Sequence, residues 1–161
     1  MNTQFSLNKL MIRDMTPDDV PLINEFFDAM GGESRAFFNR CDINRKGALK
    51  YCERLFPDRR YWIVEDEKKM LGYVYLLDWN TGVPILGIAV RDELKGKGLG
   101  RRLMEHAINE AKSARRGGLR LTTHVANLRG QMLYESLGFR CMGQDKNPQE
   151  LFYLLTFGFD I

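Results

Sequence analysis

The sequence predicts an α/β (α+β) fold with a single mixed, mostly antiparallel central sheet of about six to seven strands flanked by helices. Short apolar runs rich in β-branched and aromatic residues, such as "RYWIVED" and "ILGIAV", recur along the chain and are typical of strands. Segments with helical periodicity lie between several of these runs. Some runs are joined by tight polar turns and others by a whole helix, so hairpins and crossovers are expected in one sheet.

The N-terminal part of the chain predicts one strand and one clearly bounded helix. The strand is expected near residues 9–15. Thr16 can then cap a helix that has Pro17 at its first position, and the glycine pair at 31–32 ends it.

The next segment, residues 33–60, is harder to assign and is basic. Helical pieces are expected around residues 34–40 and 47–56. The segment contains eight Lys or Arg residues against four Asp or Glu. It is therefore either a solvated helical surface or a cover over a substrate site that prefers anionic substrates.

The remaining segments alternate between strands and helices. Residues 81–90 end in a continuous apolar run, which indicates a strand buried on both faces. Helices are expected at residues 99–114 and 127–137, with Asn127 as the cap of the second. The other expected strands are two within residues 60–79 and one each at residues 119–125, 139–143 and 151–157.

Composition excludes several classes of protein. A chain of 161 residues is expected to form a single domain, 1–161, and its 44% hydrophobic and 28% charged residues are typical of a soluble globular protein. The net charge of +3 is too small to indicate a nucleic-acid partner. Three cysteines without CxxC spacing and two histidines outside any ligand pattern predict neither disulfides nor a metal. Because the sequence contains no run typical of a secretory signal or a membrane span, we expect a cytoplasmic protein without a membrane partner.

The loop before the helix at residue 99 is unusual in its charge. Three glycines at alternate positions, Gly96, Gly98 and Gly100, lead into this helix. Basic residues surround them, namely Lys95, Lys97, Arg101 and Arg102. A helix N-terminus already carries partial positive charge and unpaired N–H groups, so added cations indicate an anion that neutralises them. Because glycines let several amides converge on one group of oxygens, the loop predicts a phosphate site.

Two familiar nucleotide patterns do not fit this loop. The dinucleotide pattern GxGxxG needs glycine or alanine where Arg101 stands, and the pattern GxxxxGK[ST] is absent. The alternative to a phosphate site is that the long basic side chains simply point to solvent.

Two stretches together resemble the GCN5-related N-acetyltransferase (GNAT) family. "ILGIAVRDELKGKGLGRRLMEHAINEA" is similar to the family's [QR]xxGx[GA] loop, with Lys95 in place of Gln or Arg, and "LTTHVANLRGQMLYESLGF" is similar to its Asn…LYE-x-LGF segment. The resemblance implies an acetyl-CoA N-acyltransferase-like fold with acetyl-CoA as co-substrate and no metal. It also implies a cofactor-binding core at about residues 84–142 and acceptor-side helices at about residues 17–60.

The resemblance further implies which residues contact the cofactor. The backbone amides of residues 96–101 would hold the CoA diphosphate, and strand residues 88–90 would pair with the pantetheine arm. Gly87, in the same strand, is either a β-bulge that aims an N–H at the thioester oxygen or a glycine that makes room for packing. The implied cofactor-binding residues are Ile88, Ala89, Val90, Lys95, Gly96, Lys97, Gly98, Leu99, Gly100, Arg101, Asn127 and Tyr134.

For catalysis, the resemblance implies a proton donor but not a general base. Tyr134 lies two turns beyond Asn127, and the resemblance implies that its hydroxyl protonates the departing CoA thiolate; the alternative is a half-buried aromatic packed on the sheet. The run "PILGIAV" contains no acid. The general base therefore stays open between His124, Asp78, Glu65 and a water molecule, and His124 could equally be a hydrogen-bonded structural residue.

The resulting hypothesis is an acetyl-CoA-dependent N-acetyltransferase that moves the acetyl group directly onto a primary amine. The acceptor is a small molecule or a peptide or protein amine. No acyl-enzyme is expected, because the cysteines lack a paired histidine pattern. The alternatives are a CoA-binding regulatory or sensor module without turnover and a nucleic-acid binder, which lacks interleaved aromatics. The apolar tail "LFYLLTFGF" offers a surface for a homodimer.

Overall fold

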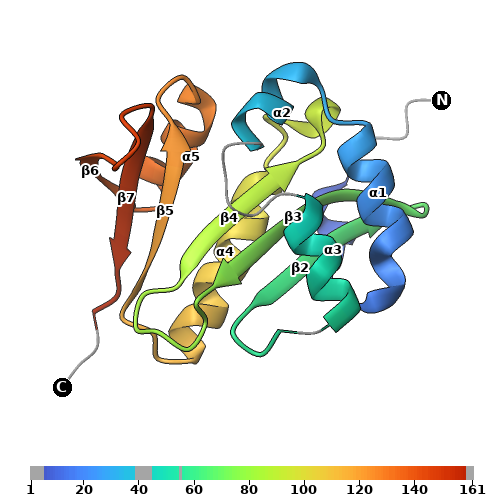
Figure 1. Cartoon of the computed structure of the whole chain (residues 1–161), viewed down its shortest axis with the longest axis horizontal. Coiled ribbons are helices and arrows are strands. Elements are labelled where there is room, and N and C mark those ends of the chain that lie inside the picture. Colours follow the sequence, from blue (N-terminus) through green and yellow to red (C-terminus); the bar gives the residue numbers. More distant parts are fainter. Residues whose placement is uncertain (1–5, 39–44, 55, 159–161) are drawn as a thin grey trace.

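The computed structural model describes residues 6–38, 45–54 and 56–158. Seven strands in these ranges form one sheet, and every neighbouring pair is antiparallel except β4 and β5, which run parallel (Figure 1). This mixed, mostly antiparallel sheet confirms the predicted fold class. In sheet order the strands are β1 (Ile12–Asp14), β2 (Arg60–Asp66), β3 (Lys69–Leu77), β4 (Ile85–Val90), β5 (Gly118–His124), β7 (Glu150–Thr156) and β6 (Arg140–Gln144).

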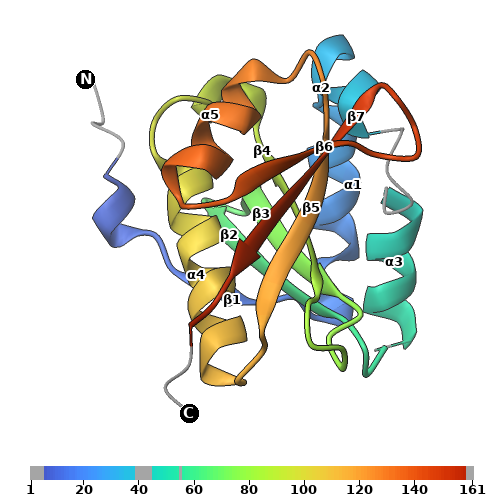
Figure 2. The same cartoon turned by 90° about the vertical axis from the view of Figure 1, so that its left-hand side faces the viewer.

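Helices cover both faces of the sheet. They are α1 (Val20–Asp28), α2 (Gly32–Phe38), α3 (Arg45–Arg54), α4 (Leu99–Ser113) and α5 (Leu128–Ser136). Figure 2 shows α4 and α5 on one side of the sheet and α1, α2 and α3 on the other. Each side has its own core: Leu103 and Met104 of α4 are buried on one face, and Ile23 and Phe26 of α1 on the other. Among the helices of the described ranges, none is long and apolar enough to cross a bilayer.

The first helix starts with the predicted cap. Thr16 and Asp19 form a capping box, and the Asp19 carboxylate accepts a hydrogen bond from the Thr16 N–H at 2.7 Å. A 3-10 turn over Pro17–Asp19 comes before α1. Burial raises the pKa of Asp19, but hydrogen bonds from Arg13 and Thr16 outweigh it and hold this pKa below its usual range.

The first strand is shorter than the predicted 9–15. Leu7–Lys9 forms a 3-10 turn, and β1 begins only at Ile12. The reason lies on α4, where the Arg102 guanidinium donates hydrogen bonds to the carbonyls of Leu7 and Leu10. These carbonyls therefore face a side chain instead of a neighbouring strand.

The helical pieces of the basic segment are confirmed within the described residues. The predictions 34–40 and 47–56 correspond to α2 and α3, while residues 39, 40 and 55 lie outside the described ranges. The Arg35 guanidinium donates to the carbonyl of Phe27 at 3.0 Å and to that of Met30 at 3.2 Å. This basic side chain thus satisfies the C-terminal end of α1.

Strands β4 and β5 separate along most of their length. β4 pairs with β3 without interruption from Leu77↔Ile85 to Gly72↔Val90, whereas its register with β5 contains only Ile85↔Arg120. The two strands diverge toward their C-terminal ends (Figure 1). The predicted burial of the apolar run 81–90 on both faces is confirmed in part. Leu86 and Ala89 are buried in cores on opposite faces of the sheet, whereas the other residues of β4 are half-buried.

The apolar tail is an interior strand. Residues 151–156 of the tail lie in β7, which pairs with β5 on one edge and with β6 on the other. This strand therefore has no free edge for a second copy of the chain, and the last residue of the tail, Phe159, lies outside the described ranges.

Candidate active site

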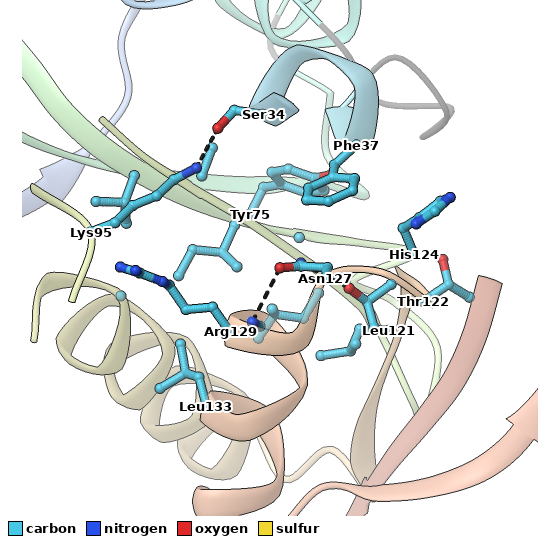
Figure 3. Close-up of a pocket in the computed structure, with 18 of the residues that line it drawn as sticks. Ser34, Phe37, Tyr75, Lys95, Leu121, Thr122, His124, Asn127, Arg129 and Leu133 are labelled. Atoms are coloured by element: carbon cyan, nitrogen blue, oxygen red, sulfur yellow. Dashed lines mark hydrogen bonds between the residues drawn. The ribbon is translucent and has the colours of Figure 1, made fainter. Parts of the chain in front are cut away.

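A cavity of about 800 Å³ occupies the opening between β4 and β5. Figure 3 shows the glycine loop, the start of α5, the end of β5 and α2 around it. Nine of the twelve predicted cofactor-binding residues line this cavity, whereas Lys97, Leu99 and Tyr134 do not. The nine are Ile88, Ala89, Val90, Lys95, Gly96, Gly98, Gly100, Arg101 and Asn127.

The glycine loop adopts a backbone that requires glycine. Gly96 has φ of +76° and Gly98 has φ of +89°, both in the left-handed region. A Cβ on Gly96 would lie 3.0 Å from the Arg129 guanidinium. Helix α4 starts directly after Gly98, so its first N–H groups lack intrahelical acceptors, and Gly100 and Arg101 of this turn line the cavity. This is the geometry of an anion site.

The basic residues around the loop have different roles. Lys95 donates to Ser34 Oγ of α2 (Figure 3) and lies 3.1 Å from the Asp92 carboxylate. Arg101 donates to Ser136 Oγ and still lines the cavity. Arg102 holds the N-terminal segment and does not line the cavity, so the prediction that it serves the anion is wrong. Arg129, which the sequence analysis missed, lines the cavity from the first turn of α5.

Gly87 takes part in a regular strand pair. It pairs with Tyr75 in the uninterrupted register between β3 and β4, so the β-bulge interpretation is wrong. A Cβ at this position would lie 1.9 Å from Cζ of Tyr75. The glycine therefore makes room for the Tyr75 ring, which reaches into the cavity (Figure 3).

Asn127 is the predicted cap of α5. Its Oδ1 accepts the Gly130 N–H at 3.2 Å, and its Nδ2 donates to Thr123 Oγ1 at 3.0 Å. The side chain thus ties the end of β5 to the start of α5 at the edge of the cavity.

Tyr134 belongs to α5, and its side chain is buried in the core between this helix and the sheet. Its exposed fraction is 7%, and its ring makes edge contacts with Phe139 and Tyr153 at centroid distances of 6.3 and 5.9 Å. Leu133, the preceding residue, lines the cavity instead. Tyr134 itself does not line the cavity, and its role as proton donor stays a prediction.

Two of the three side-chain candidates for the general base lie elsewhere. The Asp78 carboxylate accepts a hydrogen bond from Arg120 at 3.2 Å, and the Glu65 carboxylate accepts one from Arg13 at 3.0 Å. Neither Asp78 nor Glu65 lines the cavity.

His124 lines the cavity, but its ring is already oriented. Nδ1 accepts the Ala126 N–H at 3.0 Å, and the ring stacks on Phe37 with 5.3 Å between centroids. In the neutral imidazole the proton is then on Nε2, which makes this nitrogen a donor. Neutral His124 can therefore donate a hydrogen bond into the cavity, whereas its accepting nitrogen is occupied.

Glu150 is a cavity residue that the sequence analysis missed. It is 8% exposed, lines the cavity and lies opposite His124 in the register of β5 and β7. No local pattern in "NPQELF" marks it, since only the pairing of two distant strands brings it to the site.

Helix α2 is attached to the loop that follows β4. The Asp92 carboxylate accepts the Gly31 N–H and the Ser34 hydroxyl, each at 2.6 Å. Burial raises the pKa of Asp92, but the hydrogen bonds from Ser34 and Gly31 and the charge of Lys95 outweigh it and place this pKa below its usual range. Asp92 thus connects the glycine loop to the helix that forms the opposite wall. Within the described ranges, no group of three or more His, Cys, Asp or Glu side chains could hold a metal ion.

Comparison with known proteins identifies relatives of this architecture. A family model described as "Acetyltransferase (GNAT) family" matches residues 23–139. No curated protein sequence matches the chain at a significant level.

Solved structures match over almost the whole chain. The ribosomal-protein-S5-alanine acetyltransferase from Vibrio fischeri has a TM-score of 0.76 at 18% identity, covering 95% of this chain and 94% of that one. A spermidine N-acetyltransferase chimera from Vibrio cholerae and hSSAT has a TM-score of 0.73 at 19% identity, with 92% and 95% covered. The PaiA N-acetyltransferase from Thermoplasma acidophilum, in complex with coenzyme A, has a TM-score of 0.74 at 17% identity, with 92% and 99% covered. At these identities the likeness shows the fold, and it confirms the acyltransferase-like architecture expected above.

Proposed function

Because this chain belongs to the GNAT acetyltransferase family, we propose that it transfers an acetyl group from acetyl-CoA directly onto a primary amine of its acceptor. One observation carries the proposal. A single cavity joins the glycine loop to the open edge of β4, so a diphosphate group and an extended arm can be held in one continuous site.

The residues present fit acetyl-CoA. Gly96, Gly98, Gly100 and Arg101 line the cavity together with Lys95 and Arg129, and the loop amides and basic side chains suit a diphosphate. Beyond Ile85, the edge of β4 that faces β5 pairs with no strand of the described residues, so its peptide groups can hydrogen-bond the amides of the pantetheine arm as a neighbouring strand would. Bound there, acetyl-CoA supplies an activated thioester.

The reaction also requires two proton transfers, one from the acceptor amine and one to the CoA sulfur. An alkyl ammonium has a pKa of about 10.4, so the acceptor must lose a proton before its nitrogen can bond to the acetyl carbon. Water or a cavity carboxylate such as Glu150 can take this proton. As the carbon–sulfur bond breaks, the sulfur requires a proton, and we propose the Tyr134 hydroxyl as its source.

Direct transfer agrees with the positions of the described cysteines. Cys52 is buried and Cys141 is exposed on β6, and neither lines the cavity; Cys41 lies outside the described ranges. We therefore propose no acyl-enzyme. Free thiols at Cys52 and Cys141 also support the proposal of a reducing, cytoplasmic setting.

A CoA-binding regulatory module is the second candidate function. The observation that favours it is the position of Tyr134, which packs in the core and does not line the cavity. Calorimetric titration with acetyl-CoA, followed by thiol release with a panel of primary amines, separates the candidates. Binding with amine-dependent thiol release supports the transferase, whereas binding without release for any amine supports the regulatory module. A folded protein that binds neither CoA nor acetyl-CoA would contradict both.

A further inference from the structure

The face of β4 that is covered by α1 and α3 carries small residues beside the proposed site of the pantetheine arm. Successive side chains of a strand point to opposite faces of the sheet. Ala89 is buried in the core formed with α1 and α3, whereas Leu86 is buried in the core on the α4 side. Gly87 therefore shares the face of Ala89, and these two residues leave little side-chain bulk on it.

The ring of Tyr75 lies over this face at Gly87. The two residues are opposite each other in the register of β3 and β4. A Cβ on Gly87 would lie 1.9 Å from Cζ and 2.1 Å from the hydroxyl oxygen of Tyr75. The phenol end of the ring is thus the part that covers Gly87, and the ring forms part of the cavity lining (Figure 3).

Neighbouring aromatic rings hold Tyr75 in this position. Tyr75 is 4% exposed, and its ring centroid lies 5.3 Å from that of Tyr61 and 5.7 Å from that of Tyr73. Both neighbours are buried as well. Turning the Tyr75 ring away would break both contacts in a close-packed interior, so the ring is a rigid wall of the cavity.

The proposed position of acetyl-CoA brings its thioester to this wall. The glycine loop follows the C-terminal end of β4, so an arm that pairs with residues 88–90 runs from the loop toward the start of the strand. Gly87 is the residue that it reaches next. Two residues further along, Ile85 pairs with Arg120 of β5 and closes the opening between the strands. The acyl end of the site is thus bounded along the strand by this pair and above it by the Tyr75 ring.

We infer that the Tyr75 ring limits the length of the acyl group, so that the protein accepts acetyl-CoA and propanoyl-CoA as donors but excludes acyl chains of four or more carbons. This inference rests on the proposed acetyl transfer and adds the class of the donor. A longer chain must displace a buried ring that packs against two others, and a well-packed interior resists such overpacking.

Donors of increasing length provide the first test, which needs no variant. With the primary amine that releases thiol fastest from acetyl-CoA, kcat/KM is measured for acetyl-, propanoyl-, butanoyl- and hexanoyl-CoA. Because one methylene in a fitted apolar pocket changes kcat/KM by about 10- to 200-fold, we expect butanoyl-CoA to react about 100-fold or more below acetyl-CoA. Similar kcat/KM values for acetyl- and hexanoyl-CoA would overturn the inference.

Tyr75→Leu provides the second test, with Tyr73→Leu as the matched control. Tyr73 lies two residues away on the same face of β3 and is buried, but it does not line the cavity. Y75L should raise the ratio of butanoyl-CoA to acetyl-CoA turnover at least about 10-fold, whereas Y73L should keep the wild-type ratio. An unchanged ratio in folded Y75L, or the same rise in both variants, contradicts a wall formed by Tyr75.

Tyr75→Phe keeps the decision open to experiment if Y75L does not fold. This variant retains the ring and its packing but loses the oxygen atom that lies over Gly87. It should raise the same ratio by less than Y75L, and an unchanged ratio in Y75F would then count against the inference.

Calorimetry with the four donors, without an amine, examines the wall independently of turnover. A chain that meets the wall should raise the Kd of butanoyl-CoA at least about 10-fold above that of acetyl-CoA, and Y75L should remove this difference. Donors that bind and react alike whatever their length refute the inference and leave the transferase proposal intact. That proposal fails instead if no donor releases thiol with any amine.

Discussion

The cavity has two halves that are built by different means: a cofactor half, formed by the loop 95–101 and Arg129, and an acceptor half, formed by Phe37, His124, Glu150 and Phe152. The cofactor half is mainly backbone: two glycines with positive φ, the start of α4 and the unpaired edge of β4. The acceptor half is mainly side chains, which come from α2, β5 and the β6–β7 turn. A backbone site is encoded within one short stretch of sequence, whereas a side-chain site depends on how distant elements are brought together. The following experiments test this contrast, from the largest expected effect to the smallest.

Gly98→Asp should destroy the cofactor half alone. The change puts a side chain on a residue with φ of +89° and a carboxylate beside the diphosphate site. Like-charge contact should weaken CoA binding by about 1000-fold or more, which calorimetry would record as no measurable heat. Gly82→Ala is the control, since nothing lies within 4 Å of a Cβ there. CoA binding by folded G98D at wild-type strength would disprove the loop as the anion site.

Tyr134→Phe tests the proposed proton donor, which packs in the core and does not line the cavity. Loss of a proton donor should lower kcat by roughly 10²–10⁴-fold while acetyl-CoA affinity stays the same. Steady-state kinetics and calorimetry on the same preparation measure both quantities. Unchanged kcat would remove Tyr134 from the reaction and leave it as the core aromatic that its packing against Phe139 and Tyr153 describes.

Arg129→Met and Arg102→Met form a matched pair that tests which of these two arginines belongs to the cofactor half. Arg129 lines the cavity, so its loss should raise the Kd for CoA about 10-fold with little change in stability. Arg102 binds the carbonyls of Leu7 and Leu10, so its loss should lower the free energy of unfolding by about 1–2 kcal/mol with the Kd unchanged. Denaturant titration and calorimetry on both variants give the comparison. A raised Kd for CoA in R102M without a loss of stability would instead place Arg102 in the anion site.

Asp92→Asn tests the link between the halves through its pH dependence. The pKa of Asp92 is lowered in the folded state from 3.8, so the ionised carboxylate stabilises the protein above that pH and loses its effect as the pH falls through the folded value. The wild type should therefore be more stable than D92N at neutral pH, and the difference should disappear in acid. Thermal unfolding from about pH 7 down to about pH 1.5, so that the scan passes through the lowered pKa, measures it. A difference that persists at the acid end would assign the effect of the substitution to packing.

Sequence reasoning predicted those parts of the molecule that depend on local rules. The cap at Thr16, the cap at Asn127 and the strand–glycine loop–helix unit were all predicted from neighbouring residues, and the structure confirms them. A sequence-based prediction was wrong where a contact with residues far along the chain sets the role of a side chain. Arg102 was placed in the anion site because its sequence neighbours line it, but the carbonyls of the N-terminal segment are its partners. For Gly87 the sequence left a bulge and a packing gap open, and the Tyr75 ring on the adjacent strand decides for packing.

Taken alone, the sequence determined the order of strands and helices, the glycine loop and the family resemblance, because periodicity, caps and short motifs act through neighbouring residues. Only the tertiary structure decided that β4 and β5 share a single paired position and then separate, which opens the cavity. It also decided that Arg129, Glu150 and Phe37 line that cavity. These outcomes follow from strand register and from packing between distant elements, which a linear pattern does not contain.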